Sequence, residues 1–351
     1  MMNERYLNKI ICADTLQLLP NIEGNSIDVV LTDPPYFLDK LDNNWDHVEV
    51  SNKSNQHTVK SLPAGMKFDR EQGIRFYKWY LDISKEIIRV LKPGGFFFSF
   101  SSPRLYHRMA CAIDDAGFEI RDAFIWLYTQ NQAKAMGLDH FIKKMNVDEN
   151  TKEKIKAKLN GWKTPQIKSC FEPIAMAQKP VDQTYLNNIL KHEIGLLNTN
   201  IKIGNNMYPA NVFTIDSINE LIDRTFLLPK PSKKEKAEYN DHNTVKPVAI
   251  CEYLIKLSTF SKNAVVLDPF IGSGTTAVAA KRLGKNYIGI DANEKYVKIA
   301  ERRIKELDDK PDLFKPEKVV ENHKKTGRPL AIWKNGKAVM VPASKILPKS
   351  K

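Results

Sequence analysis

Two apolar, strand-like runs in this sequence each end at an aspartate that opens a tight turn. Ser26 to Thr32 leads into Asp33-Pro34-Pro35-Tyr36, and Ala264 to Leu267 leads into Asp268-Pro269-Phe270-Ile271-Gly272-Ser273-Gly274-Thr275-Thr276. Short apolar runs bounded by turn residues are typical of buried parallel strands. Open parallel sheets bind their ligands beyond the carboxyl ends of the strands. The pattern therefore predicts one ligand site built from both turns.

Strands alternate with amphipathic helices along most of the chain. The expected strands are Ile10 to Asp14, Ser26 to Thr32, Phe96 to Phe100, Phe124 to Tyr128, Pro173 to Ala177, Ala264 to Leu267 and Tyr287 to Ile290. The expected helices are Gly73 to Leu91, Tyr106 to Gly117, Thr275 to Leu283 and Glu294 to Leu307. This alternation predicts an α/β fold with a mostly parallel sheet and helices on both faces.

Three segments break the alternation. Phe37 to Gln72 is polar and predicts a mobile loop, and Val181 to Asn240 is Asn-rich and predicts a separate lobe. The tail beyond Pro311 is basic, and Asn335-Gly336 within Ile332 to Val339 predicts a tight β-hairpin. The predicted organisation is a catalytic half (1–180), a small lobe (181–240), a cofactor-binding half (241–310) and a basic C-terminal extension (311–351).

Composition limits the class of protein. The 351 residues carry a net charge of +13, concentrated in 134–168, 230–236 and the tail, which favours a polyanionic partner such as nucleic acid. No apolar run approaches the ~18 residues that span a bilayer, so we expect no membrane association. The chain has four cysteines, and they are scattered: Cys12, Cys111, Cys170 and Cys251. This predicts a reduced, cytoplasmic setting without a disulfide framework or a metal site.

The second turn has the pattern expected of a cofactor loop. Gly272 to Ala277 matches G-x-G-x-x-A between a strand and a helix, where glycines allow close approach of a ligand and free N–H groups at the helix start attract its negative end. Asp291 ends the next strand, where an acid can bind ribose hydroxyls. A phosphate-binding Walker loop is excluded because no Gly-Lys-Ser/Thr follows. An NAD-dependent oxidoreductase remains open on this segment alone.

The first turn has the groups needed for chemistry on an exocyclic amine. Pro34 and Pro35 fix the backbone and carry no N–H, which leaves the nearby carbonyls free to accept hydrogen bonds. The nitrogen of an aromatic amine is a poor nucleophile because its lone pair is delocalised. The Asp33 carboxylate and the Pro34 carbonyl could hold both amino hydrogens and expose that lone pair. Tyr36 could stack on the base, a contact worth ~1–3 kcal/mol.

As they stand, the two turns resemble the motifs of the amino-group (adenine-N6/cytosine-N4) DNA methyltransferases that use S-adenosylmethionine. The catalytic motif precedes the cofactor motif, which is the order of the family's β group, with the target-recognition region between them. The resemblance implies a Rossmann-like sheet of seven strands with an antiparallel hairpin strand at one edge. It also implies that Phe171-Glu172-Pro173, with Lys179-Pro180, packs near the flipped base.

The resemblance assigns roles to individual residues. Catalysis is implied for Asp33, Pro34, Pro35 and Tyr36. Cofactor contacts are implied for Asp14, Asp33, Lys246 in Asn243-Thr244-Val245-Lys246-Pro247, Asp268, Phe270, Gly272, Ser273, Gly274, Thr275, Thr276 and Asp291.

Aspartate at the first position of the catalytic motif indicates adenine, because the family's cytosine enzymes more often carry serine there. The expected activity is therefore site-specific methylation of the adenine amino group in DNA, with base flipping. Methylation of the cytosine amino group is the alternative. The sequence leaves open whether a restriction endonuclease accompanies the protein and whether the chain forms a homodimer.

Overall fold

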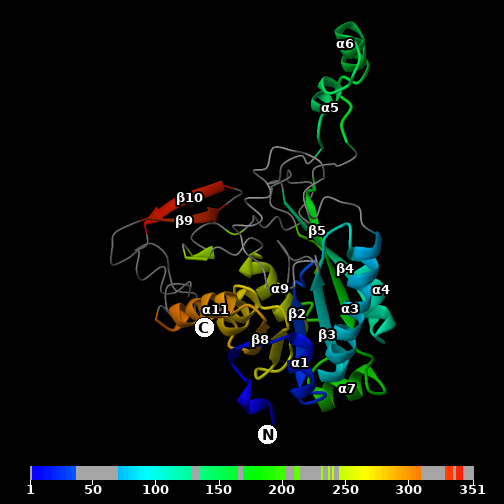
Figure 1. The fold of residues 1–351 in the computed structure, drawn as a ribbon. Coiled ribbons are helices and arrows are strands. Elements are labelled where there is room, and N and C mark those ends of the chain that lie inside the picture. The colour runs from blue at the N-terminus through cyan, green and yellow to red at the C-terminus, as the bar shows by residue number, and fades with distance from the viewer. Residues whose placement is uncertain are drawn as a thin grey trace. The chain divides into compact units, whose positions relative to one another are not determined.

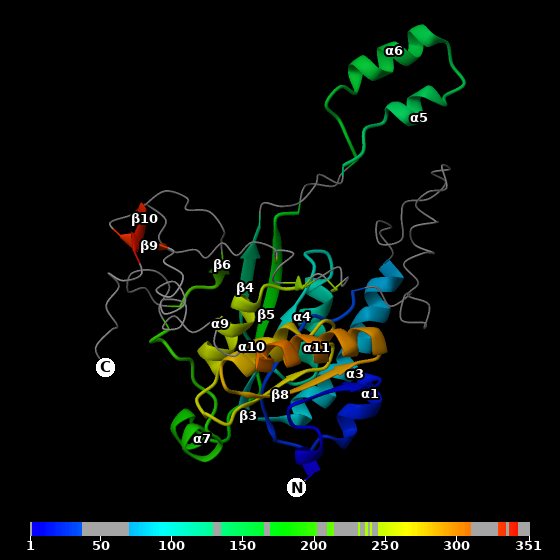
Figure 2. The same cartoon turned by 90° about the vertical axis from the view of Figure 1, so that its left-hand side faces the viewer.

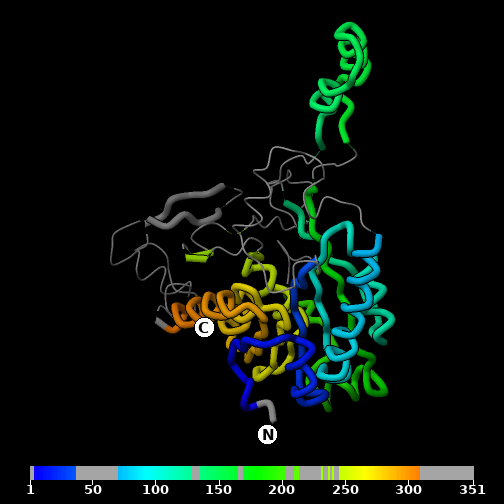
Figure 3. Tube along the Cα trace, in the orientation of Figure 1, coloured from blue at the N-terminus to red at the C-terminus, as the bar shows by residue number. Residues whose placement is uncertain are grey.

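The fold was analysed in a computed structural model of the chain (Figures 1 and 2). The structure describes residues 2–36, 70–128, 135–164, 169–201, 209–213, 231, 236–237, 239–240, 245–309, 329–334 and 337–342, which Figure 3 shows in colour apart from the chain ends and the last hairpin. Two compact units divide the chain, 1–300 and 301–351, and each is considered by itself.

A single mostly parallel sheet forms the centre of the first unit. Its strands are β1 (Lys9–Cys12), β2 (Ile27–Thr32), β3 (Leu91–Phe100), β4 (Glu119–Leu127), β5 (Phe171–Gln178), β6 (Val212–Phe213), β7 (Val265–Asp268) and β8 (Asn286–Asp291). Their order is β1-β8-β7-β2-β3-β5-β4-β6. Pairs are parallel except that β5 is antiparallel to both β3 and β4. The predicted seven-stranded Rossmann-like sheet is confirmed, and the two-residue β6 extends its edge. The antiparallel strand was expected at one edge, but β5 lies between β3 and β4.

Helices lie on both faces of this sheet (Figure 1). The helical segments of the described chain are η1 (Met2–Arg5), α1 (Thr15–Leu18), η2 (Leu19–Asn21), α3 (Arg70–Val90), α4 (Tyr106–Asp115), α5 (Asp139–Lys143), α6 (Glu149–Lys158), α7 (Tyr185–His192), α9 (Val248–Ser258), α10 (Thr275–Arg282) and α11 (Glu294–Asp309). None of the helices in this described part is long and apolar enough to cross a bilayer.

The largest core cluster lies between the sheet and helices α3 and α4. Helix α3 has apolar side chains at helical spacing, and these are buried: Phe76, Tyr80, Ile83, Ile87 and Val90. They meet alternate residues of the central strands, such as Val30 and Phe97. The predicted helix over 73–91 is thus confirmed, but it begins at Arg70, so the loop prediction was wrong for 70–72. Glu71 lies in the first turn, where the helix dipole favours an acid. Residues 37–69 of the predicted loop lie outside the described residues.

Part of the predicted lobe packs against the sheet. Asn188 on α7 is fully buried, and its amide donates to the carbonyls of Pro93 (3.0 Å) and Ile194 (2.8 Å). Gly94 has φ +76°, and a Cβ there would lie 2.4 Å from the Asn188 amide nitrogen. Residues 181–201 therefore contribute to the same compact unit as the sheet. The target-recognition role of 181–240 stays a prediction.

One buried ion pair was not anticipated from the sequence. Asp28 lies within β2 and is fully buried, where Lys92 binds one carboxylate oxygen at 2.7 Å and the Val265 backbone N–H donates to the other at 2.7 Å. Burial raises the pKa of Asp28, and Lys92 opposes that shift. The acid therefore ties β2 to the start of β7.

The second unit holds the end of α11 and a two-stranded antiparallel sheet of β9 (Pro329–Lys334) and β10 (Lys337–Pro342). This confirms the predicted hairpin, while its Asn335-Gly336 turn lies outside the described residues. Helices α5 and α6 of the lysine-rich segment were not predicted. An isolated bridge between Gly137 and Lys163 closes the segment that contains them.

Candidate active site

Four aspartates meet at one edge of the sheet because four neighbouring parallel strands end there. Asp14 follows β1, Asp291 ends β8, Asp268 ends β7 and Asp33 follows β2. The two turns are joined directly: the Thr32 hydroxyl donates to Asp268 at 2.6 Å across 236 positions of sequence. The structure thus brings the two predicted motifs side by side.

The backbone donors of the second turn are largely used within the protein. The N–H of Phe270 donates to Asp268 (3.0 Å), that of Gly272 to Asp291 (2.9 Å), and those of Ile271 and Gly274 to carbonyls. All four of these groups precede the first residue of α10, Thr275, so the prediction of free N–H groups at the helix start stays a prediction. Such a turn, flanked by carboxylates, suits a ligand with hydroxyl and ammonium donors better than a dinucleotide pyrophosphate.

Gly274 sets the shape of this turn. It is the N-cap of α10 with φ +87°, and a Cβ there would lie 2.8 Å from the Ala300 Cβ. Only glycine fits a left-handed position this close to a neighbouring backbone. Ser273 before it and Thr275 and Thr276 after it are buried, and the Thr276 hydroxyl donates to the Leu31 carbonyl of β2.

Asp291 is placed to receive hydroxyl groups. Its two oxygens accept from the backbone N–H of Gly272 (2.9 Å) and Asn293 (2.8 Å). Burial raises its pKa, and these two hydrogen bonds oppose the shift. Each carboxylate oxygen can accept more than one bond, so acceptor capacity remains for a ligand. Asp14, one strand further along, caps α1 by accepting from the Gln17 N–H at 3.2 Å.

Asp268 is the most deeply buried acid at this edge. Burial raises its pKa to about 7, against hydrogen bonds from Thr32, Thr276 and the Phe270 backbone. Phe270 itself packs at the core, with its ring centroid 5.4 Å from that of Trp79. The carboxyl of Asp268 therefore changes charge near neutral pH, and it links the folding of the two turns to proton binding.

This linkage predicts a pH-dependent stability that Asp268→Asn removes. Because the pKa is raised in the folded state, the contribution is fully present below the unfolded value of 3.8 and is lost as pH rises through about 7. Between pH 5 and 8, wild type should lose roughly 2–3 kcal/mol that the variant does not lose. Thermal melting of both proteins across this range measures the difference, and parallel curves would contradict it.

The catalytic loop holds Asp33 between two donors. The Tyr36 hydroxyl donates to Oδ1 at 2.5 Å, and the Lys246 ammonium donates to Oδ2 at 2.5 Å. Burial and the neighbouring acids Asp33 and Glu172 raise the pKa of Tyr36, so the hydroxyl keeps its proton. Pro34 is buried and Pro35 half-buried beside this pair. Tyr36 therefore orients the carboxylate of Asp33, and Oδ2 is the oxygen that contacts the Lys246 ammonium.

Lys246 is a member of the predicted set whose contacts differ from its expected role. Its Nζ lies 2.5 Å from Asp33, 3.1 Å from Glu172 Oε2 and 5.3 Å from the Phe100 ring centroid. Burial opposes its charge, but the two carboxylates outweigh this and raise its pKa. These contacts place the Lys246 ammonium at the catalytic loop, and the cofactor contact stays a prediction. Asn243 and Thr244 of the same motif lie outside the described residues.

The expected neighbourhood of Lys179 and Glu172 was wrong in one respect. Glu172 begins β5 beside Lys246, whereas Lys179 follows the end of β5, about 24 Å further along at ~3.4 Å per residue. There the Lys179 ammonium donates to the carbonyls of Ile88 (2.7 Å) and Leu91 (2.8 Å), at the end of α3. Glu172 is therefore close to the catalytic loop, and Lys179 has a structural role.

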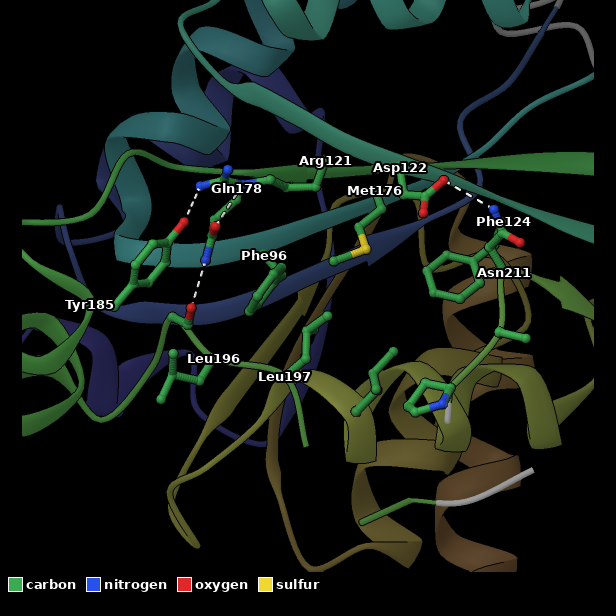
Figure 4. A pocket seen from close by; sticks show the side chains of 14 residues that line it. Phe96, Arg121, Asp122, Phe124, Met176, Gln178, Tyr185, Leu196, Leu197 and Asn211 are labelled. Atoms are coloured by element: carbon green, nitrogen blue, oxygen red, sulfur yellow. Dashed lines mark hydrogen bonds between the residues drawn. The ribbon is translucent and has the colours of Figure 1, made fainter. Parts of the chain in front are cut away.

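A separate cavity of about 600 Å³ lies away from the two turns (Figure 4). Phe96 on its wall pairs with Val29, well before β2 reaches the catalytic loop. Arg121 crosses its rim and donates to Gln178 (2.9 Å) and Tyr185 (2.5 Å), as the dashed lines show. None of the residues predicted for catalysis or cofactor binding lines it.

Known proteins with a similar sequence or fold were found. Two curated relatives are each 28% identical: the type II methyltransferase M.HindIII of Haemophilus influenzae, over 83% of this chain and 93% of the relative, and M2.DpnII of Streptococcus pneumoniae, over 87% and 93%. Among solved structures, the M1.HpyAVI–SAM complex is 20% identical with a TM-score of 0.48 over 84% of this chain and 98% of that one. PvuII DNA methyltransferase (cytosine-N4-specific) is 16% identical with a TM-score of 0.48 over 84% and 85%.

The family assignment comes from the model of the N6/N4 methyltransferases, described as DNA methylase, which matches residues 27–302. That range includes the catalytic loop after β2, the cofactor turn after β7 and every strand of the large sheet except β1. The chain therefore belongs to the N6/N4 amino-group DNA methyltransferases, enzymes that act on DNA with S-adenosylmethionine as cofactor.

Proposed function

We propose that this protein methylates the N6 amino group of adenine at specific sites in DNA. The observation that carries the proposal is the Asp33-Pro34-Pro35-Tyr36 loop, held at the sheet edge beside Asp268 with Oδ2 of Asp33 directed at a nitrogen donor. Aspartate at the first position of this motif favours adenine over cytosine. A target base inside a duplex is out of reach, so it flips out at a cost of a few kcal/mol.

The catalytic loop acts by holding the amine rather than by strong base catalysis. In this proposal Oδ2 of Asp33 accepts one amino hydrogen and the Pro34 carbonyl accepts the other. Both bonds draw the nitrogen toward tetrahedral geometry, so its lone pair would be free to bond the methyl carbon as the carbon–sulfur bond breaks and the thioether leaves. Tyr36 keeps Oδ1 occupied through its own hydroxyl, which leaves a single rotational position for the carboxylate. The methylated amine is cationic and therefore acidic, so it loses its proton without a strong base.

The residues of the second turn suit S-adenosylmethionine, which supplies an electrophilic methyl group when bound. We assign the ribose hydroxyls to Asp291, whose oxygens lie at the carboxyl end of β8. Asp268, Phe270 and the Gly272 to Thr276 turn would line the methionine end, and Asp14 the adenine end. The buried carboxylates and the internally bonded N–H groups of this turn match a cationic, phosphate-free ligand.

Methylation of the cytosine amino group is the alternative within the same chemistry. The motif geometry serves either base, since each presents an exocyclic amine in the plane of an aromatic ring. We favour adenine on the identity of Asp33 alone. An oxidoreductase that uses NAD is disfavoured, because it would leave the Asp33-Pro34-Pro35-Tyr36 loop without a role.

The proposal is tested by expression in a host that lacks DNA methylation, followed by single-molecule sequencing of the host DNA. We expect N6-methyladenine at one short recognition sequence, and no signal from cells that carry Asp33→Ala. N4-methylcytosine at that sequence would show that cytosine is the target base, and unmodified DNA would overturn the proposed function. Because the substrate is chromosomal DNA, we place the protein in the cytoplasm, and its type II relatives suggest a cognate restriction endonuclease.

A further inference from the structure

Lys246 occupies a position that the proposed reaction needs. The target amine has to donate a hydrogen bond to Oδ2 of Asp33, and in this structure that oxygen already accepts from the Lys246 ammonium at 2.5 Å, so the amine and the ammonium would share one carboxylate oxygen. The other oxygen is already bonded to the Tyr36 hydroxyl. An ammonium and an amino group are both nitrogen donors, so the lysine makes the same kind of contact that the base would make.

We infer that Lys246 holds the place of the target amine in the DNA-free protein and passes to Glu172 when the flipped base enters. The inference rests on the proposed function, because it concerns how the same site admits its substrate. Lys246 is thus a positioning residue, and Glu172 is the acceptor that makes its withdrawal possible.

Charge explains why the lysine has to withdraw. As the methyl group is transferred, the amine nitrogen becomes positively charged next to Asp33. A second positive charge on the same carboxylate oxygen would oppose this development, and the opposition is stronger in a partly buried site than in water. The Lys246 side chain is only 8% exposed, so it cannot simply move into solvent.

Glu172 offers a partner within a short movement. Its Oε2 lies 3.1 Å from the Lys246 Nζ and is fully buried. Apart from this ion pair, Oε2 has no hydrogen-bond partner among the described residues. A small rotation of the lysine stem would convert a shared ion pair into one made with Glu172 alone. A buried ammonium keeps a counter-charge throughout, which avoids the cost of an unpaired charge.

Three variants test the transfer through their charge. Glu172→Gln leaves Asp33 as the only anionic partner of Lys246, so the lysine should remain on Asp33 and compete with the base. Lys246→Met removes the competitor but leaves two neighbouring carboxylates without a cation. The double variant, Glu172→Gln with Lys246→Met, removes one charge of each sign and frees Oδ2 of Asp33. Its net charge at the site equals that of wild type.

Turnover on unmethylated plasmid DNA with radiolabelled S-adenosylmethionine is the readout. We expect kcat of Glu172→Gln to fall by roughly 10–100-fold, and the double variant to recover at least about tenfold of that loss. Two independent structural roles predict instead that the losses multiply. If kcat of the double variant does not exceed kcat of the less active single variant, the inference is overturned.

Lys246→Arg provides a second test in a variant that keeps the charge. A planar guanidinium can bridge both carboxylates at once, so it should hold the pair without release. We expect an unchanged melting temperature with kcat reduced by roughly tenfold or more. Wild-type turnover in Lys246→Arg would show that the cation serves only as a counter-ion and would overturn the transfer.

The two levels of the hypothesis fail in different ways. Wild-type protein that transfers no methyl group to DNA would remove the proposed function. Wild-type protein that methylates DNA, combined with a double variant without recovery, would remove only the role of Lys246. Melting temperature and calorimetric cofactor affinity of each variant show whether a loss of turnover comes from misfolding.

Discussion

Replacement of Asp33 by alanine is expected to remove methyl transfer almost completely while the affinity for S-adenosylmethionine changes by no more than a few fold. The carboxylate is the acceptor that holds the target amine, and loss of one such preorganised contact costs about 10²–10³ in kcat. The variant also leaves Lys246 with Glu172 as its remaining acid partner, so the buried ammonium stays paired. Turnover on unmethylated DNA and cofactor titration by calorimetry are the two measurements.

Asp33→Asn sharpens the same test. The amide keeps one acceptor oxygen and the shape of the side chain, so partial activity would fit an acceptor role. Asp82→Ala serves as a matched control, because this acid lies on the exposed side of α3 with 64% of its side chain accessible. Turnover of Asp33→Ala near that of the control would exclude the catalytic assignment.

Replacement of Asp291 by alanine should weaken cofactor binding by roughly 10–100-fold, the range expected for loss of a hydrogen-bonded, charged acceptor at about 1.5–3 kcal/mol. The carboxylate accepts from Gly272 and Asn293, so its removal also frees two backbone donors that shape the turn. Calorimetric titration with S-adenosylmethionine in the absence of DNA measures the effect directly.

Asp291→Asn separates the two contributions. The amide can accept from one backbone N–H but cannot serve as an acceptor at both positions, so we expect an intermediate affinity. The Asp82→Ala protein again provides the reference. An unchanged dissociation constant in Asp291→Ala would remove this residue from the ribose site, and a lowered melting temperature alone would assign it to the turn.

Much of the fold was predictable because its signals are local. Apolar runs of four to six residues that end at turn residues marked β2, β7 and β8, and each is present in the sheet. The helical period of α3 matched its buried face. The hairpin of the basic tail was predicted from Asn335-Gly336, which lies within Ile332 to Val339, and its two strands pair as expected.

Other features depend on partners far apart in the sequence. From the sequence, Ser26 to Thr32 was predicted as an apolar run, and only the approach of Lys92 and Val265 shows how Asp28 is tolerated within it. Lys179 looked like a neighbour of Glu172, but an intervening strand sends the two to opposite ends of β5. The sequence did not indicate that Asp268 and Asp291 accept hydrogen bonds from the backbone N–H groups of Phe270 and Gly272.

By itself, the sequence determined the class of fold and the chemistry of the two turns, because strand period, proline rigidity and glycine conformations are properties of neighbouring residues. Only the tertiary structure decided which groups face one another at the edge of the sheet. The contact of Lys246 with Asp33 joins residues 213 positions apart, and no local pattern encodes such a distance. It arises because Lys246 precedes α9, and α9 packs beside β2, whose carboxyl end leads into Asp33.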